Sequence, residues 1–296
     1  MKLSKELIWL NLGVLFMSTS GIFGRQIQIQ PELAIFYRCL FAAIILFVFI
    51  KFNKLNYKTI QKGHLKYIIL GGLLLAVHWV TYFYSLSLHS IAIAILTLHT
   101  FPVMTTILEP ILLKTPFRLY HMGLALLVIA GIWVILPSLD LGDELVMATV
   151  FGVFSALTYA LRNIWTRKMM SHYNGSVMMF FQLSCCCLVL IPFPFVFEAS
   201  PTQMDWTLLA CLALLTTVLG HTMIVTSLKH FSAVTVSLIS CIIPIYGILW
   251  GVLFIDEIPN SRTLLGGSLI LISFFAESFL SKKKSTSNKL NGEFKN

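Results

Sequence analysis

The chain alternates between long apolar runs and short polar connections along nearly its whole length. An apolar run of about 20 residues lets an α-helix cross the roughly 30 Å hydrocarbon core of a bilayer, because each residue adds about 1.5 Å. Ten runs approach this length, so the pattern predicts an all-α polytopic membrane protein with ten transmembrane helices. They cover approximately Leu7–Phe23, Leu33–Phe52, Tyr67–Leu86, Ile91–Leu113, Leu119–Leu136, Leu145–Thr166, Val177–Phe197, Trp206–Leu228, Ala233–Ile255 and Leu264–Leu280.

The composition is that of a chain that lies mostly within a bilayer. Of its 296 residues, 57% are apolar and 11% are charged, whereas soluble domains average roughly 45–50% apolar and 25% charged residues. The longest predicted connection, residues 53–66, is too short to bury a hydrophobic core. We expect the first run to remain as a helix, because further spans follow it and no cleavage site of small residues does. Any function must therefore reside in the membrane part.

The basic residues indicate how the spans are oriented, because Lys and Arg accumulate in cytoplasmic loops. When ten spans are threaded from an inside amino terminus, all but three of the 21 Lys and Arg residues fall on the inside, Arg162 among them. Arg25 and Arg262 fall outside, and Arg38 lies within the second span. Both termini are therefore predicted to be cytoplasmic, with residues 282–296 as a disordered basic tail. Short basic loops explain the net charge of +9 without a nucleic-acid partner.

An internal repeat divides the chain into two halves, residues 1–142 and 143–281, with five predicted helices each. Five residues coincide, including Pro102 and Pro244, when SLSLHSIAIAILTLHTFPVMTTIL from Ser85 is aligned without gaps with SLKHFSAVTVSLISCIIPIYGILW from Ser227. Because an odd number of spans brings the second half into the membrane from the opposite side, the repeat has inverted topology. That architecture is typical of secondary transporters, whose site lies near the bilayer midplane between the halves.

Several motifs resemble those of a known family. They are PELAIFYRCLFAA, which contains Arg38, the polar step into the fourth and ninth helices before a central proline, and the helix endings HMGLALLVIAGIWV and LLGGSLILISFFA. Over nearly the whole chain they resemble the EamA branch of the drug/metabolite transporter superfamily. The resemblance implies a bundle with cytoplasmic termini and a central cavity, and mostly exporters of amino acids, related metabolites or drugs. It also implies an acidic residue after the fourth and ninth helices; Glu257 follows the ninth, whereas Lys114 stands in that region of the first half.

One stretch of the third span, AVHWVTYFY at residues 76–84, contains polar-tipped aromatic side chains near the bilayer midplane. At roughly 100° per residue, His78, Trp79 and Tyr82 share one face of the helix. A polar group at that depth is costly unless it faces protein or a water-filled cavity. The face therefore predicts either the lining of a central substrate-binding cavity, which we adopt, or hydrogen bonding between helices.

Residues on other spans extend this candidate site. His99 lies near the middle of the fourth span, and His221 aligns with Trp79 when the ungapped alignment of the repeat is extended, so the two halves would face each other across one chamber. The first and sixth spans add polar and aromatic candidates, which are Asn11, Tyr159 and Trp165. Packing between helices is the alternative for each of these residues.

The spans also contain two central prolines and two charges. Pro102 and Pro244 each remove one backbone hydrogen bond, which predicts either a packing kink or a loosened gate. Arg38 lies roughly 9 Å below the outer end of the second span, where it can anchor the helix or bind a substrate carboxylate. Glu109, near the inner end of the fourth span, can pair with a neighbouring basic residue such as Lys114 or carry a proton.

Motifs of enzymes are missing from the sequence. It contains no P-loop of the form G-x-x-x-x-G-K-[ST] and no recognisable nucleophile motif. The six cysteines lie within predicted spans without C-x-x-C spacing, so we predict neither a metal site nor a cofactor.

We predict a secondary, alternating-access transporter of the inner membrane, and by resemblance an exporter. Aromatic walls suit a small organic metabolite such as an amino acid or a related compound as the substrate, and the lipid bilayer is the other partner. A non-transporting membrane scaffold and a channel-like facilitator are the alternatives. Proton coupling through His78, whose side chain can titrate near neutral pH, and a homodimer stay open.

Overall fold

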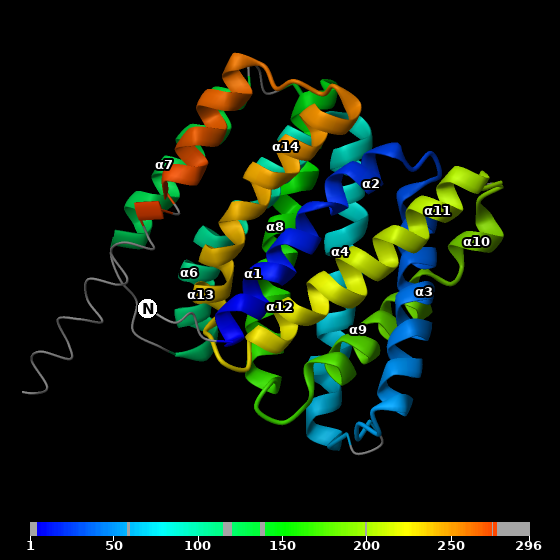
Figure 1. Ribbon diagram of the computed structural model, residues 1–296. Helices are drawn as coiled ribbons and strands as arrows, with labels where there is room; N and C mark the ends of the chain where they lie inside the picture. Colours follow the sequence, from blue (N-terminus) through cyan, green and yellow to red (C-terminus); the bar gives the residue numbers. More distant parts are fainter. Residues whose placement is uncertain are drawn as a thin grey trace, which may run out of the picture.

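The computed structural model describes residues 5–57, 60–114, 120–136, 140–198, 200–273 and 275–276. Within these residues every regular element is a helix, as predicted (Figure 1). Eight helical stretches are long and apolar enough to cross a bilayer: Lys5–Gln26, Pro31–Phe52, Lys62–Leu88, Ile91–Leu113, Glu144–Met169, Gly175–Val196, Gln203–Ser227 and Ala233–Ile255. Two shorter apolar helices, Met122–Ile135 and Ser261–Ser273, lie where the sequence predicts the fifth and tenth spans. The chain is thus an all-helical polytopic membrane protein, and the predicted tail at residues 282–296 lies outside the described residues.

Most of these stretches are built from several helical segments. In the first half they are α1 (Lys5–Ser18), α2 (Ser20–Gln26), α3 (Pro31–Phe52), α4 (Lys62–Leu88), α5 (Ile91–Leu98), α6 (Phe101–Leu113) and α7 (Tyr120–Ile135). In the second half they are α8 (Glu144–Met169), α9 (Gly175–Leu190), α10 (Phe193–Val196), α11 (Gln203–Cys211), the π-helix η1 (Leu212–His221), α12 (Thr222–Ser227), α13 (Ala233–Ile239), the 3₁₀-helix η2 (Ser240–Ile242) and α14 (Ile243–Ile255).

Serine side chains mark where the fourth and ninth spans begin. Ser90 accepts a hydrogen bond from the N–H of Ile93 at the start of α5, and Ser232 accepts one from the N–H of Thr235 at the start of α13. Such N–H groups have no partner within their own helix, so a capping side chain stabilises the helix end. The ungapped alignment of the internal repeat pairs these two serines with each other.

The same two spans are interrupted just before a proline. α5 ends at Leu98 and α6 begins at Phe101, with Pro102 as its second residue. The 3₁₀ turn η2 separates α13 from α14, whose second residue is Pro244. Because the first N–H groups of a helix have no helical partner, a proline there sacrifices no bond. Each proline thus begins a new segment.

Helices α4 and α8 lie side by side along the middle of the bundle (Figure 1). Gly152 lets α8 approach both α5 and α4, because a Cβ atom at that position would lie 1.9 Å from Oγ1 of Thr97 on α5 and 3.3 Å from Oγ of Ser85 on α4. α9 packs against α3 and α4, while η1 packs against α1 and α3. α7 and the helix Ser261–Ser273 lie beside each other at the edge of the bundle.

Two faces of the bundle can be distinguished by the helix ends that they carry. We call the face with the start of α1 and the end of α6 the lower face, and the face with the end of α2 and the start of α5 the upper face, as drawn in Figure 1. Basic residues at the helix ends of the lower face include Lys51, Lys62, Lys114 and Lys168.

Arg162 is buried in the bundle, so its predicted place among the inner loop charges was wrong. α8 continues to Met169, which puts Arg162 about two turns inside the helix end, and its side chain is fully buried. Its Nε atom donates to Oε1 of Gln182 on α9 at 3.0 Å, and its Nη1 atom donates to Asn163 at 3.1 Å. The charge is held at the contact between α8 and α9.

Candidate functional site

A narrow chamber lies in the middle of the bundle, between segments of the first, third, fourth, sixth, eighth and ninth spans. Its volume is about 30 Å³, which has room for only one or two water molecules. The polar part of its wall is made by Ser20 together with His78, Trp79, Tyr82, His99, Tyr159 and His221. The structure thus brings six of the predicted site residues together, in a conformation that is too tight for a metabolite.

The third span supplies three of these side chains from one face of α4. His78, Trp79 and Tyr82 are 2%, 1% and 4% exposed. Tyr84 lies on another side of the helix and donates instead to a carboxylate oxygen of Glu32 at 2.6 Å.

Ser155 of α8 holds the ring of His78 in place. The Ser155 hydroxyl donates to the His78 carbonyl oxygen at 2.7 Å, and Nδ1 of His78 lies 2.7 Å from the Ser155 Oγ. Because the hydroxyl has one proton, Nδ1 must be the donor in the second contact, and Nε2 is left as an acceptor. The imidazole also stacks on Tyr159, with ring centroids 4.4 Å apart. These contacts join the third span to the sixth.

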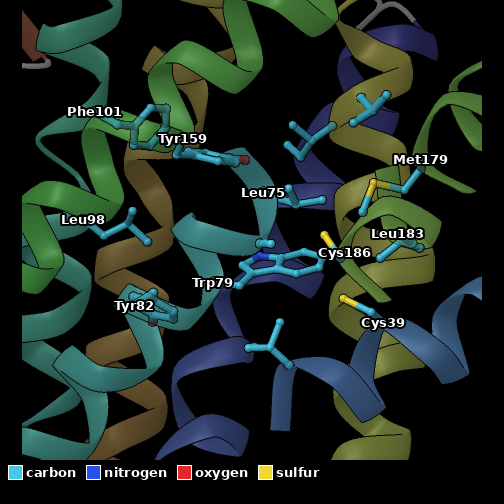
Figure 2. Packing of buried hydrophobic residues seen from close by; sticks show 14 of the residues in the cluster. Cys39, Leu75, Trp79, Tyr82, Leu98, Phe101, Tyr159, Met179, Leu183 and Cys186 are labelled. Carbon is cyan, nitrogen blue, oxygen red and sulfur yellow. The ribbon is translucent and has the colours of Figure 1, made fainter. Parts of the chain in front are cut away.

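Arg38 of α3 lies against the indole ring of Trp79, with its guanidinium carbon 3.9 Å from the ring centroid. Its Nε atom donates to Oγ1 of Thr217 at 2.7 Å, and its Nη2 atom donates to Oγ1 of Thr216 at 3.0 Å. The side chain is fully buried. Figure 2 shows Trp79 extending from α4 among buried apolar side chains. Because Trp79 also lines the chamber, one ring contacts both the cation and the chamber.

The π-helix η1 presents two consecutive threonines to Arg38. Backbone hydrogen bonds in a π-helix join residues five apart, and such turns occur frequently at functional sites. The Thr216 and Thr217 hydroxyls both donate to the carbonyl oxygen of Leu212, at 2.6 Å and 3.3 Å. The last residue of η1 is His221, whose ring meets Trp79 edge to face at a centroid distance of 5.0 Å.

Three buried polar atoms at or beside the chamber have no hydrogen-bond partner in the described part of the chain. They are Nη1 of Arg38, Nε2 of His99 and Nδ1 of His221. Nδ1 of His99 lies 2.7 Å from the Ile95 carbonyl oxygen and donates to it, so Nε2 of the neutral ring is an acceptor, with the backbone of Ser240 near the ring. Unpaired buried polar groups cost about 1–3 kcal/mol each, and more when they are charged. His99 and His221 line the chamber, whereas Arg38 lies against the Trp79 ring.

Carboxylates are not placed against Arg38. Among the described residues, an ion pair shorter than 4.0 Å is found between Arg25 and Glu257, and Arg38 takes no part in one. The buried Glu109 and Asp205 side chains accept hydrogen bonds from backbone N–H groups of other segments. Arg38 is therefore a buried cation whose neighbours in the described residues are neutral.

The other predicted site residues lie away from the chamber wall. Asn11 is exposed on α1 and donates to a carbonyl oxygen of its own helix at 2.8 Å. Trp165 stacks on Tyr67 near the lower end of α8, with ring centroids 5.3 Å apart. Pro102 and Pro244 are buried at the starts of α6 and α14.

Sequence reasoning missed the residues that hold the site in place, namely Ser155, Thr216 and Thr217. Serine and threonine occur throughout the spans and bond to their own helices, so no sequence signal distinguishes these three. Within the described residues, no group of three or more His, Cys, Asp or Glu side chains is arranged to hold a metal ion.

Comparisons with known proteins agree with this architecture. The model of the EamA-like transporter family matches residues 4–136 and, a second time, residues 146–277. The chain is 26% identical over 212 residues to the pseudopaline exporter CntI of Pseudomonas aeruginosa, covering 71% of this chain and 73% of that protein. It is 25% identical over 266 residues to the uncharacterized transporter YoaV of Bacillus subtilis, covering 85% of this chain and 88% of the relative.

A solved crystal structure shares the fold, with a TM-score of 0.70, 16% sequence identity and coverage of 94% of this chain and 99% of the other. Because the family model covers both halves, the chain belongs to the EamA-like transporter family and is a multi-pass transporter of the inner membrane.

Proposed function

We propose that this chain is a secondary transporter that exports a small organic metabolite by alternating access. The observation that carries the proposal is the polar chamber at the centre of the bundle, walled by side chains from both halves of the chain, with unpaired buried atoms at its edge. A scaffold would gain stability by pairing those atoms. A transporter needs a site that closes in at least one conformation, and a chamber of about 30 Å³ meets that requirement.

The helix contacts support two inverted halves, residues 1–142 and 143–281. When each span is exchanged for its counterpart five spans later, observed contacts become other observed contacts. The contact of α4 with α8 corresponds to that of α12 with α1. The contact of α9 with α4 corresponds to that of η1 with α3. The contact of α5 with α14 corresponds to that of α13 with α6. The two separate family matches fall one in each half. A two-fold axis in the membrane plane would place the chamber between the halves.

The orientation follows from the basic residues at the helix ends. Because Lys and Arg favour the cytoplasmic side, the lower face with Lys51, Lys62, Lys114 and Lys168 is the cytoplasmic one. Export then means that the substrate enters the chamber from the lower face and leaves at the upper face. The 26% identical relative CntI is an exporter, which supports this direction.

The chemistry of the chamber favours a substrate with a carboxylate and an amino group. The carboxylate would bind the free Nη1 of Arg38, which has no carboxylate within 4.0 Å in the described residues. The free acceptor Nε2 of His99 would bind an N–H group. Trp79 and Tyr159 offer ring faces to an apolar or aromatic part of the molecule. An amino acid or a related compound has all three features.

A metabolite screen tests the proposal. Purified protein in liposomes is offered pools of amino acids, their derivatives, and neutral and cationic compounds, with and without a proton gradient. Saturable uptake of at least one carboxylate-bearing amine is the expected result. Uptake limited to cationic or neutral compounds would overturn the role of Arg38, and no saturable uptake of any compound would overturn the transport proposal.

A further inference from the structure

We propose that Glu257 and Glu109 are gate carboxylates on opposite faces of the membrane. Glu257 follows the ninth span and contacts the start of the fourth. Glu109 lies near the end of the fourth span and contacts the start of the ninth. Glu257 closes the upper face together with Arg25, and Glu109 closes the lower face together with Arg167. The inference rests on the proposed alternating access and names the side chains that shut each face in turn.

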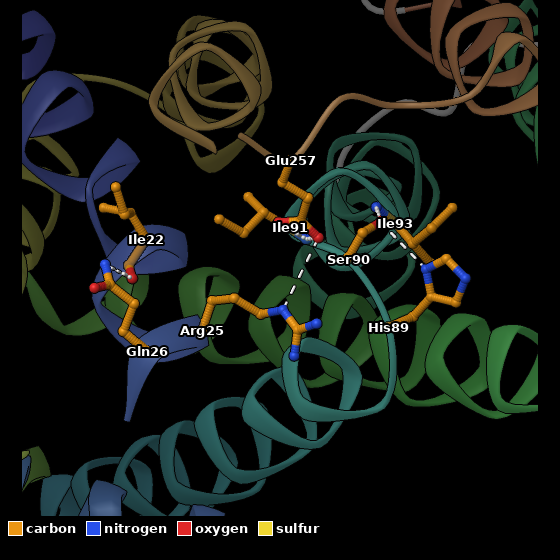
Figure 3. A network of polar contacts seen from close by, with 8 residues as sticks. All are labelled: Ile22, Arg25, Gln26, His89, Ser90, Ile91, Ile93 and Glu257. Carbon is orange, nitrogen blue, oxygen red and sulfur yellow. Dashed lines mark hydrogen bonds and ion pairs between the residues drawn. The ribbon is translucent and has the colours of Figure 1, made fainter. Parts of the chain in front are cut away.

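The upper contact joins three groups (Figure 3). Both carboxylate oxygens of Glu257 accept from the backbone N–H of Ile91 at the start of α5, at 3.1 Å and 3.2 Å. Nε of Arg25, at the end of α2, lies 3.9 Å from the same carboxylate. Ile91 and Arg25 belong to the first half and Glu257 to the second. The upper ends of the halves therefore cannot separate without breaking this contact.

The lower contact repeats the arrangement with the halves exchanged. Oε2 of Glu109, in α6, accepts from the backbone N–H of Val234 at the start of the span Ala233–Ile255, at 3.2 Å. Arg167, near the end of α8, interacts electrostatically with Glu109 and lines the same cavity. Here the carboxylate belongs to the first half, while the N–H group and the arginine belong to the second.

Sequence positions relate the two contacts in part: the arginines align in the repeat, Ile91 aligns with Ala233, one residue before Val234, and the two carboxylates do not align. The ungapped alignment of the two halves, extended in both directions, pairs Arg25 with Arg167 and Lys114 with Asp256. Lys114 and Asp256 end α6 and α14 in the same left-handed conformation with φ of 54°. The left-handed Asp256 directly precedes Glu257, whereas the lower carboxylate comes from Glu109, inside α6 and ahead of Lys114. In the first half the carboxylate thus comes from Glu109 within α6, whereas in the second half it comes from Glu257 after the end of α14.

The two contacts are in different states in this structure. The upper one has an ion pair and one N–H group shared by both carboxylate oxygens, and the Glu257 side chain is 21% exposed. The lower one has one hydrogen bond to Val234, and in the described residues Glu109 has no ion pair within 4.0 Å. Beside it lies a cavity of about 520 Å³ whose wall includes Lys114, Arg167 and Lys168. The upper gate is closed, and the lower gate is the one prepared to open.

Alternating access requires that the two faces are never open at the same time, although both contacts can be present together, as they are here. When the halves rock about the chamber, closing the lower face brings Arg167 onto Glu109, and opening the upper face withdraws Glu257 from Ile91 and Arg25. Each carboxylate also accepts from a backbone N–H group at the start of a helical segment, a contact that favours its charged form in the closed gate. Weakening one gate should therefore strengthen the other.

Hydrogen–deuterium exchange of the full chain in lipid nanodiscs tests this coupling. Glu257→Gln should speed exchange in peptides around Ile91 and slow it around Val234, each by about tenfold if one charge-assisted contact of ~1.4 kcal/mol is lost. Glu109→Gln should do the reverse. Arg25→Gln keeps the carboxylate contact with Ile91, removes only the ion pair, and should give a smaller change in the direction of Glu257→Gln. Glu144→Gln, an exposed carboxylate on the upper face, is the matched control and should change neither region.

The reciprocal change on the far face is the decisive readout, because a carboxylate that only caps a helix would alter its own face alone. A local change without a far-face response in both Glu→Gln variants would overturn the gates, even if liposome transport persists. Failure of the wild type to transport any compound, with the reciprocal exchange still present, would instead overturn the proposed function and leave the paired contacts standing.

Discussion

Arg38→Met removes a buried guanidinium while keeping an apolar side chain of similar reach. In the native protein the fully buried charge has two threonine hydroxyls and one indole ring as its neighbours. Burying an ion costs several kcal/mol, which neutral partners repay only in part. The change strands no hydroxyl proton, because Thr216 and Thr217 both donate to the Leu212 carbonyl oxygen. The variant should therefore be as stable as the wild type, or more stable.

Transport should respond in the opposite way. A hydrogen bond to a charged group contributes about 1.5–3 kcal/mol, so losing the contact between Nη1 and a substrate carboxylate should raise KM by at least about tenfold. Arg38→Lys keeps the positive charge but loses the planar guanidinium, which can donate to Thr216, Thr217 and a ligand at the same time. We therefore expect a KM between those of the wild type and Arg38→Met. Uptake into proteoliposomes gives KM, and thermal unfolding in detergent gives stability.

Arg162→Met provides the matched control, because it removes an equally buried arginine that the chamber does not use. Its loss leaves Oε1 of Gln182 without the donor that it has now, which should lower stability by about 1–3 kcal/mol. KM should change little in the protein that stays folded. If Arg38→Met instead lost about 3 kcal/mol of stability with an unchanged KM, Arg38 would be a structural anchor and the reasoning would be wrong.

Three further variants address the chamber and its packing. Trp79→Leu should insert normally but raise KM about tenfold, since it removes the ring that joins Arg38 to the chamber; an unchanged KM in uptake assays would assign Trp79 to packing. His78→Gln should bind substrate, yet lose any pH dependence of the transport rate that runs through His78, and a wild-type pH profile would exclude His78 from proton coupling. Gly152→Ala should lower thermal stability by about 1–3 kcal/mol or more, because its Cβ atom would lie 1.9 Å from Oγ1 of Thr97; unfolding at the wild-type temperature would contradict that packing.

The parts of the fold that could be predicted are those set by a single helix. Apolar length marks a span, so the eight long helices lie where the sequence predicts them. The angular spacing along α4 also put His78, Trp79 and Tyr82 on one face, and the structure places all three at the chamber wall. The count of ten spans and the inverted repeat stay predictions.

Contacts between helices could not be predicted in the same way. Asn11 lies on a helix that is apolar all round, so nothing in its spacing tells the outside of the bundle from the inside. Trp165 and Arg162 lie close to the end of an apolar run, but α8 extends beyond that run, and its neighbours decide what each side chain meets. The role of Ser155 depends on His78, 77 residues earlier, which becomes a neighbour only after folding.

Counterflow in proteoliposomes tests the central claim of alternating access most directly. Vesicles loaded with excess unlabelled substrate are diluted into a trace of the labelled compound, without any ion gradient. A carrier whose chamber faces one side at a time should accumulate the label transiently above equilibrium, and Arg38→Met should abolish the overshoot. Labelled substrate that only equilibrates, at a rate independent of the unlabelled load, would contradict alternating access and identify a channel-like facilitator.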